Sequence, residues 1–203
     1  MIRGILLIFN PIRNWDKIAG AQRGFLFVLL LHLLPLMMVT LGLETWMIDR
    51  FGEKNRMTDL VVKVPRQTAI DYGATEFVLN LVVVLLGAAI VHKIGNTFHG
   101  HQTYLECFTL MAYGLAPLFY LHVVDGYPRA PTWVCFSIGI LLSVMLLYQG
   151  MPRLLKPDPT KALGLYLTIS IVLVLLALLV HLLAVFVLRQ QLDIRFWETW
   201  SRP

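Results

Sequence analysis

Five stretches of this 203-residue sequence are long and apolar enough to cross a lipid bilayer. A spanning helix needs about 20 mostly apolar residues. The stretches cover residues 25–43, 75–93, 104–124, 132–149 and 162–188. Because backbone polar groups in hydrocarbon must be satisfied within the segment itself, each stretch is predicted to be a helix. The sequence therefore predicts an all-α protein, a five-span transmembrane helical bundle forming a single membrane domain over residues 1–203.

The composition excludes the soluble alternatives. Residues of the AVILMFWYC set make up 58% of the chain and charged residues only 14%. Soluble domains carry about 25% charged residues. A chain this short has too much surface to hide such an apolar excess in a core, and disordered chains are much less hydrophobic. No nucleic-acid-binding motif accompanies the net charge of +5, so we expect no nucleic-acid partner.

The segment before the first span has the pattern of a helix lying on a membrane. Asn10 is a good N-cap, and Pro11 suits the first helical position. Ile12, Trp15 and Ile18 then recur at three-residue spacing among basic residues. This pattern predicts an N-terminal interfacial amphipathic helix in the headgroup layer.

Charge distribution sets the expected orientation. Four basic residues lie in residues 1–23, close to the first span, where the positive-inside rule is strongest. In the hydrophilic segment 44–76, basic and acidic residues alternate, so we interpret it as a solvated loop outside the membrane. The prediction is a protein integral to the cytoplasmic (inner) membrane, with its N-terminus in the cytoplasm and its C-terminus outside.

Few ionisable or amide side chains fall within the predicted spans. Apart from Glu76 at the border of the second span, Glu106 is the single acid there, and we expect it to pair with Lys93 or Arg153 near the inner end of its helix. The alternative is that Glu106 and Asn80 line a polar path for a transported substrate. His122 and His181 both lie about 25 Å along their helices, so this pair is the candidate ligand set for a cofactor.

No motif supplies catalytic chemistry. The sequence contains no nucleophile elbow, phosphate loop or helical zinc signature, and the His99-Gly100-His101 run reads as a polar turn. Cys107 and Cys135 lie in apolar stretches and are expected to be buried thiols. We therefore predict no enzyme activity, no catalytic residue, no metal site and no required cofactor.

Three sequence stretches together resemble the bacterial Yip-domain family, which is related to the eukaryotic Ypt-interacting proteins. They are IFNPIRNWDKIAG before the first span, TYLECFTLMAYGLAPLFYL in the third, and LYQGMPRLLKPDPTKALG after the fourth. The residues that carry the resemblance are Pro11, Trp15, Tyr113, Gly114, Pro117, Tyr148, Gly150, Pro152, Lys156 and Lys161. They occur in the order expected of the family, and the resemblance extends over nearly the whole chain.

The resemblance implies a five-span helical protein with its N-terminus in the cytoplasm. Eukaryotic members bind Rab-type GTPases and one another, but this chain lacks a clear DLYGP motif and a long cytoplasmic N-terminal domain, which counts against GTPase binding. We expect a non-enzymatic scaffold or interaction protein, acting as an accessory subunit of a membrane complex or as a membrane-organising protein. Its expected partners are the lipid bilayer and other membrane proteins or further copies of itself. The alternatives are a small transporter or channel that uses Glu106 and intramembrane histidines, and a cofactor-carrying subunit that uses His122 and His181.

Overall fold

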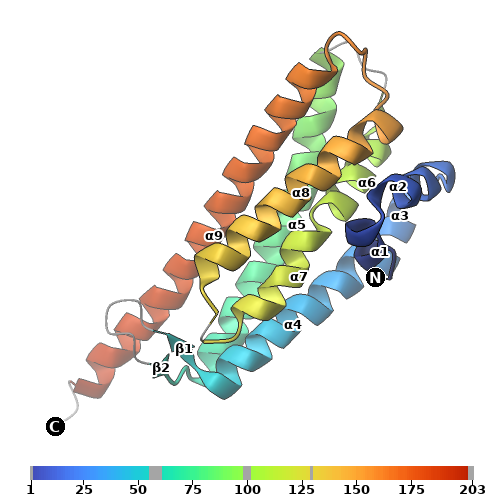
Figure 1. Ribbon diagram of the computed structural model, residues 1–203. Coiled ribbons are helices and arrows are strands. Elements are labelled where there is room, and N and C mark those ends of the chain that lie inside the picture. Colours follow the sequence, from blue (N-terminus) through green and yellow to red (C-terminus); the bar gives the residue numbers. More distant parts are fainter. Residues whose placement is uncertain (1, 55–60, 98–101, 129, 201–203) are drawn as a thin grey trace.

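The computed structural model describes residues 2–54, 61–97, 102–128 and 130–200, which are almost entirely helical (Figure 1). A short antiparallel pair, Glu53–Lys54 with Val61–Val62, is the exception. The elements in chain order are α1 (Ile2–Phe9), α2 (Pro11–Gly20), α3 (Phe25–Val28), the π-helical turn η1 (Leu29–Leu33), α4 (Leu34–Phe51), β1 (Glu53–Lys54), β2 (Val61–Val62), α5 (Arg66–Thr97), α6 (Tyr104–Gly114), α7 (Ala116–Asp125), α8 (Thr132–Leu154) and α9 (Ala162–Trp200).

Five helical segments among these residues have the length and apolarity of membrane spans, which confirms the predicted fold class. They are Phe25–Phe51, Arg66–Thr97, Tyr104–Asp125, Thr132–Leu154 and Ala162–Ala184. In the span formed by α6 and α7, 78% of the most apolar stretch is buried, against 33–39% in the other four. The α6–α7 span is therefore the central helix of the bundle, and the others each leave one face for lipid.

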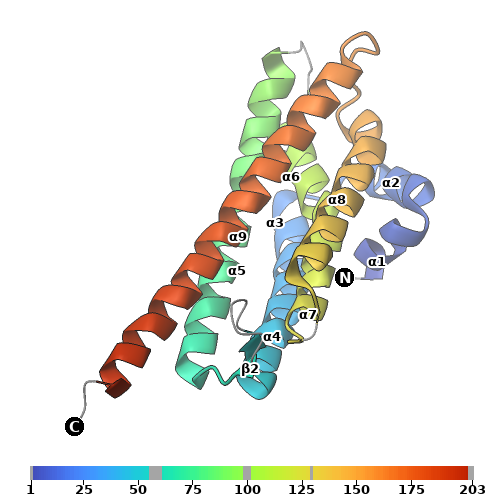
Figure 2. The same ribbon diagram turned by 60° about the vertical axis from the view of Figure 1, so that its left-hand side comes forward.

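The helices pack as an elongated bundle whose two ends differ. α5 packs against α6 and α9, while α7 packs against α4 and α8 (Figures 1 and 2). We call the end at which α4 and α7 finish and α5 and α8 begin the distal end. The opposite, proximal end carries α1 and α2, which lie against α8 (Figure 1).

The first two spans extend further at the distal end than the sequence indicated. The helices continue beyond the predicted spans 25–43 and 75–93 into the segment interpreted as a solvated loop, because α4 runs to Phe51 and α5 already begins at Arg66. The acidic side chains Glu44 and Glu76 suggested a loop, but both point into the bundle and are buried. Because His122 lies close to both carboxylates, the two acids can be buried and the helices continue through these positions.

Prolines and glycines mark the irregular points of the spans. The π-helical turn η1 ends at Leu33, and α4 follows directly with Pro35 in its first turn. The central span is divided at Leu115, and Pro117 stands in the first turn of α7, where its missing N–H removes no helical hydrogen bond. Pro152 lies inside the last turn of α8, and this helix ends at Leu154, five residues beyond the predicted span 132–149.

The N-terminal segment forms two short helices that dock on the bundle. Asn10 caps α2, with its side-chain oxygen accepting a hydrogen bond from the backbone N–H of Arg13 at 3.4 Å, and Pro11 takes the first helical position as predicted. Trp15, which lies against Gly150 of α8, and Ile18 are buried, while Ile12 on the same predicted stripe is exposed. Of the apolar stripe expected to face lipid, Trp15 and Ile18 therefore pack against protein, and Ile12 remains on the outer surface.

Candidate functional site

A cluster of three ionisable side chains lies in the distal half of the bundle, one from each of three helices. Glu44 comes from α4, Glu76 from α5 and His122 from α7, and their exposed fractions are 2%, 1% and 8%. The Nδ1 atom of His122 lies 3.1 Å from Oε2 of Glu44 and 3.5 Å from Oε1 of Glu76. We call these three residues the polar triad.

Helical periodicity brings the two carboxylates to the interior. On α4 the buried residues Thr40, Glu44 and Ile48 recur every fourth position, and on α5 Tyr72, Glu76 and Asn80 do the same. Side chains four residues apart share one helix face. This spacing is the signal that sequence reasoning missed, since Glu44 and Glu76 were both assigned to the loop between the spans.

Further polar groups surround the polar triad. The hydroxyl of Tyr72 donates a hydrogen bond to Oε1 of Glu44 at 3.4 Å. The loop after α7 covers Glu44 closely, because a Cβ added at Gly126 would lie 3.0 Å from the Cα of Glu44. Tyr72 of α5 thus contacts the carboxylate of Glu44, and the loop packs on the backbone of α4 at the same residue.

The charges of the polar triad need compensation. Two ionised carboxylates and one protonated imidazole carry a net charge of −1, and a buried unpaired charge is strongly destabilising. A proton shared between the carboxylates or a cation bound among the three side chains would neutralise the cluster. The arrangement is therefore chemically suited to hold a proton or a metal ion.

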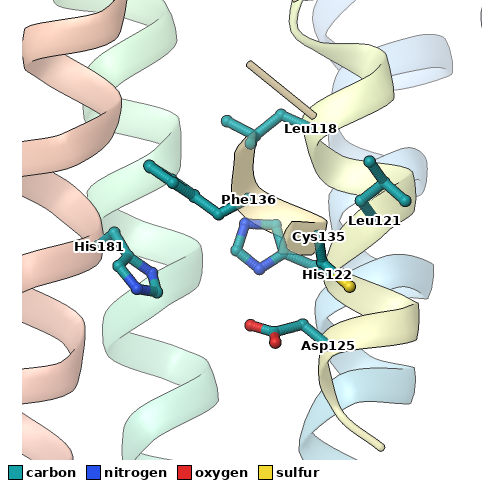
Figure 3. A pocket seen from close by; sticks show the side chains of 7 residues that line it. All are labelled: Leu118, Leu121, His122, Asp125, Cys135, Phe136 and His181. Atoms are coloured by element: carbon teal, nitrogen blue, oxygen red, sulfur yellow. The ribbon is translucent and has the colours of Figure 1, made fainter. Parts of the chain in front are cut away.

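His122 also lines a small cavity next to the polar triad. The cavity measures about 10 Å³ and has room for roughly one water molecule. Asp125 lies one turn beyond His122 on α7, and His181 on α9 faces the cavity from the opposite side (Figure 3). The ring of His181 stacks on Phe136 with 4.7 Å between ring centroids. His122 and His181, the predicted candidate pair, both line this cavity, which is too small to hold a porphyrin.

Glu106 and Asn80, the proposed polar path, do not come together in the structure. Glu106 forms a capping box at the start of α6, accepting hydrogen bonds from the backbone N–H of Thr103 at 2.7 Å and from its hydroxyl at 3.0 Å. The prediction that Glu106 pairs with Lys93 or Arg153 is wrong, because the N-cap threonine supplies the nearer donors. The Asn80 amide donates to the backbone carbonyl of Glu76 at 3.0 Å, one turn away on α5.

Several residues of the resembling stretches meet at the proximal end. Trp15 is fully buried, with its ring edge-on to Tyr113 at 6.3 Å between centroids. His32 stacks on the same Tyr113 ring at 3.8 Å. A Cβ at Gly150 would lie 2.7 Å from the Trp15 indole, so only glycine leaves room for it. We call Trp15, Tyr113 and Gly150 the aromatic junction; it holds α2 against α6 and α8.

The remaining residues of those stretches are dispersed around the same end. A Cβ at Gly114 would lie 2.6 Å from Leu147, which makes Gly114 a close-packing point of α6 on α8. Tyr148 is exposed and contacts Tyr166 edge-on at 4.8 Å. Lys156 is exposed after α8, and Lys161 directly precedes α9. The predicted turn residues His99 to His101 lie outside the described residues.

Comparison with known proteins identifies one family. A family model described as "Yip1 domain" matches residues 5–181 of the chain, which include the aromatic junction and the polar triad. No curated protein and no solved structure matches the chain. The match thus covers all of the first four spans and most of the fifth.

Proposed function

This chain belongs to the Yip1 domain family of integral membrane proteins, and from that premise we propose that it is a membrane scaffold that binds other membrane proteins or a second copy of itself. The family is not generally enzymatic. The proposed role is that of a non-enzymatic accessory or membrane-organising subunit, which acts from the cytoplasmic membrane with its N-terminus inside.

The observation that carries the proposal is the way α1 and α2 are presented. Leu7 of α1 and Trp15 of α2 are fully buried against the rest of the protein, so the two helices are held by their inner faces. Their outer faces leave Phe9 82% and Ile12 58% exposed, directly beside the basic residue Arg13. An apolar and basic surface of this kind suits contact with anionic headgroups and with a neighbouring membrane protein.

The aromatic junction supports the same role. Trp15, Tyr113 and Gly150 belong to the stretches that resemble the family, and all three act in packing α2 onto the bundle. None of them lines the cavity beside His122. Residues used to position a surface, and not to line a pathway, are what a scaffold requires.

Co-purification in native lipid tests the proposal. The protein is extracted with its surrounding bilayer and chemically cross-linked, and partners are identified by mass spectrometry. We expect a stoichiometric partner or a defined oligomer that is lost in Trp15→Ala, which frees α2, and is kept in the control Trp46→Ala, which changes an exposed tryptophan on α4. A monomer with neither partner nor lipid preference would overturn the proposal.

A small transporter or channel is the second candidate function, and the polar triad is the observation that favours it. Its residues would then be Glu44, Glu76 and His122, with Glu106 acting as a helix cap. Flux measured in proteoliposomes should fall in Glu76→Gln and persist in Glu106→Gln. Equal flux in the two variants would remove this candidate.

A further inference from the structure

We propose that Glu44, Glu76 and His122 form a binding site for one divalent transition-metal cation, which clamps α4, α5 and α7 together near the distal end of the bundle. The proposal goes beyond the scaffold function and does not depend on it. It assigns to the polar triad a ligand, a stoichiometry and a structural consequence.

The spacing of the ligand atoms agrees with a metal centre. One ligand atom from each of the three residues lies within 4.8 Å of the other two. Zinc binds nitrogen and carboxylate oxygen at about 2.0–2.2 Å, so two ligands at a tetrahedral centre lie about 3.4 Å apart. The separations from His122 Nδ1 to the two glutamate oxygens, 3.1 Å and 3.5 Å, fall on either side of that value.

The chemistry of the donor set selects the class of cation. One imidazole nitrogen and two carboxylates suit zinc, manganese or iron, whereas calcium and magnesium prefer sites built from oxygen alone. A divalent cation balances the two ionised carboxylates and leaves His122 neutral, the form in which imidazole binds a metal. The buried cluster would then carry no net charge.

A second, independent observation points to a ligand at this place. The Oε2 atom of Glu44 is fully enclosed and accepts no well-directed hydrogen bond, although it lies 3.1 Å from His122 Nδ1. The other oxygen, Oε1, is oriented by the Tyr72 hydroxyl, which is the kind of outer hydrogen bond that supports metal-binding carboxylates. One carboxylate oxygen is thus held by a hydrogen bond, while the other faces His122 without a well-directed one.

The polar triad lies a short distance from the bundle end. The cavity beside it, of which His122 alone among the three residues forms part of the wall, accommodates roughly one water molecule. Glu44 lies seven residues before the end of α4 and His122 three before the end of α7, or about 10 Å and 5 Å along the helices. The site is therefore within a few turns of the distal surface.

Metal titration of the purified protein tests the proposal. The full chain is prepared without a histidine tag, stripped with a chelator and equilibrated with Zn²⁺ or Mn²⁺, and the bound metal is then counted by mass spectrometry. We expect one ion per chain and a rise in Tm when the metal is added. Glu44→Gln and Glu76→Gln should each lower the affinity at least tenfold. Glu106→Gln, the same substitution at the α6 cap, should bind as the wild type does.

The outcomes separate a metal centre from a proton-sharing cluster. A wild type that takes up no metal, or glutamine variants that bind as well as the wild type, would overturn the proposal and leave the polar triad holding a proton. If the glutamine variants do not fold, the absorption spectrum of Co²⁺ added to the wild type tests whether the site binds a metal. A nitrogen- and oxygen-ligated Co²⁺ spectrum that Zn²⁺ abolishes and Tyr72→Phe weakens supports the site, and its absence refutes it. None of these results depends on partner binding or flux.

Discussion

Replacing Trp15 with alanine should release α2 from the bundle while the five spanning helices stay in place. The indole is fully buried, packs edge-on to Tyr113 and lies against Gly150. The one described ion pair between α2 and the bundle joins Asp16 Oδ1 to Arg153 Nε at 2.7 Å, and the Asp16 side chain is 61% exposed. The indole should therefore account for most of the docking free energy, and the ion pair for little.

The free-energy cost of each substitution follows from the burial of Trp15 and the exposure of Asp16. Truncating a buried tryptophan to alanine costs about 3–5 kcal/mol, and the lower value applies here because a released α2 stays at the membrane interface. An exposed ion pair contributes about 0.2–1 kcal/mol. Since 1.4 kcal/mol is a factor of ten, Trp15→Ala should raise the open population of α2 roughly 100-fold, and Asp16→Ala less than about sixfold.

Hydrogen–deuterium exchange of the α2 backbone amides in nanodiscs measures this opening directly. Trp46→Ala is the matched control, because Trp46 is 55% exposed on α4 and its loss should leave exchange in α2 unchanged. A change below tenfold in Trp15→Ala would refute the reasoning. So would a larger effect from Asp16→Ala than from Trp15→Ala, because the ion pair would then dominate the docking.

Three further predictions rest on local geometry. Gly150→Ala should lower thermal stability in detergent by about 1–3 kcal/mol, because the added Cβ would lie 2.7 Å from an indole, whereas Gly42→Ala meets nothing within 4 Å and should be neutral or stabilising. Thr103→Ala should cost about 0.5–2 kcal/mol by the same measurement, since it removes the N-cap acceptor from the capping box of α6. The Thr160 backbone N–H and hydroxyl hold the pKa of Asp158 below its ordinary value, so this turn is favoured at neutral pH and lost as acidification passes the lowered pKa. Thr160→Ala should return that pKa toward its usual range, as followed by carboxyl NMR titration.

The spanning helices could be predicted from sequence because apolarity over a fixed length is a strong constraint in a bilayer. The N-cap of α2 at Asn10 was also predicted from sequence, since it depends on local chemistry. The docking of Trp15 on Tyr113 could not be predicted, because an apolar stripe beside basic residues suits contact with either lipid or protein. Only the fold decides which of the two it meets.

The polar triad was missed for a different physical reason. An acid at the border of an apolar stretch ordinarily marks the end of a span, and Glu44 and Glu76 both stand at such borders. In the structure His122, a residue far away in sequence, lies within 3.5 Å of both acids and partly offsets their burial, so the helices continue past them. The recurrence of Tyr72, Glu76 and Asn80 at every fourth position was the available signal, and it pointed to a buried polar face.

The polar triad and the aromatic junction should behave as independent units. Cys135 lines the cavity beside His122, and Gly150 contacts Trp15, so the two sites are fifteen residues or about 22 Å apart along α8. Substitutions more than about 10 Å apart without shared partners are usually additive. Trp15→Ala should therefore leave metal affinity unchanged, and metal removal should loosen the distal helices without raising exchange in α2. If Trp15→Ala changed metal affinity, or metal removal changed exchange in α2, the two sites would be coupled. Such coupling would mean that α8 transmits strain between the two ends of the bundle.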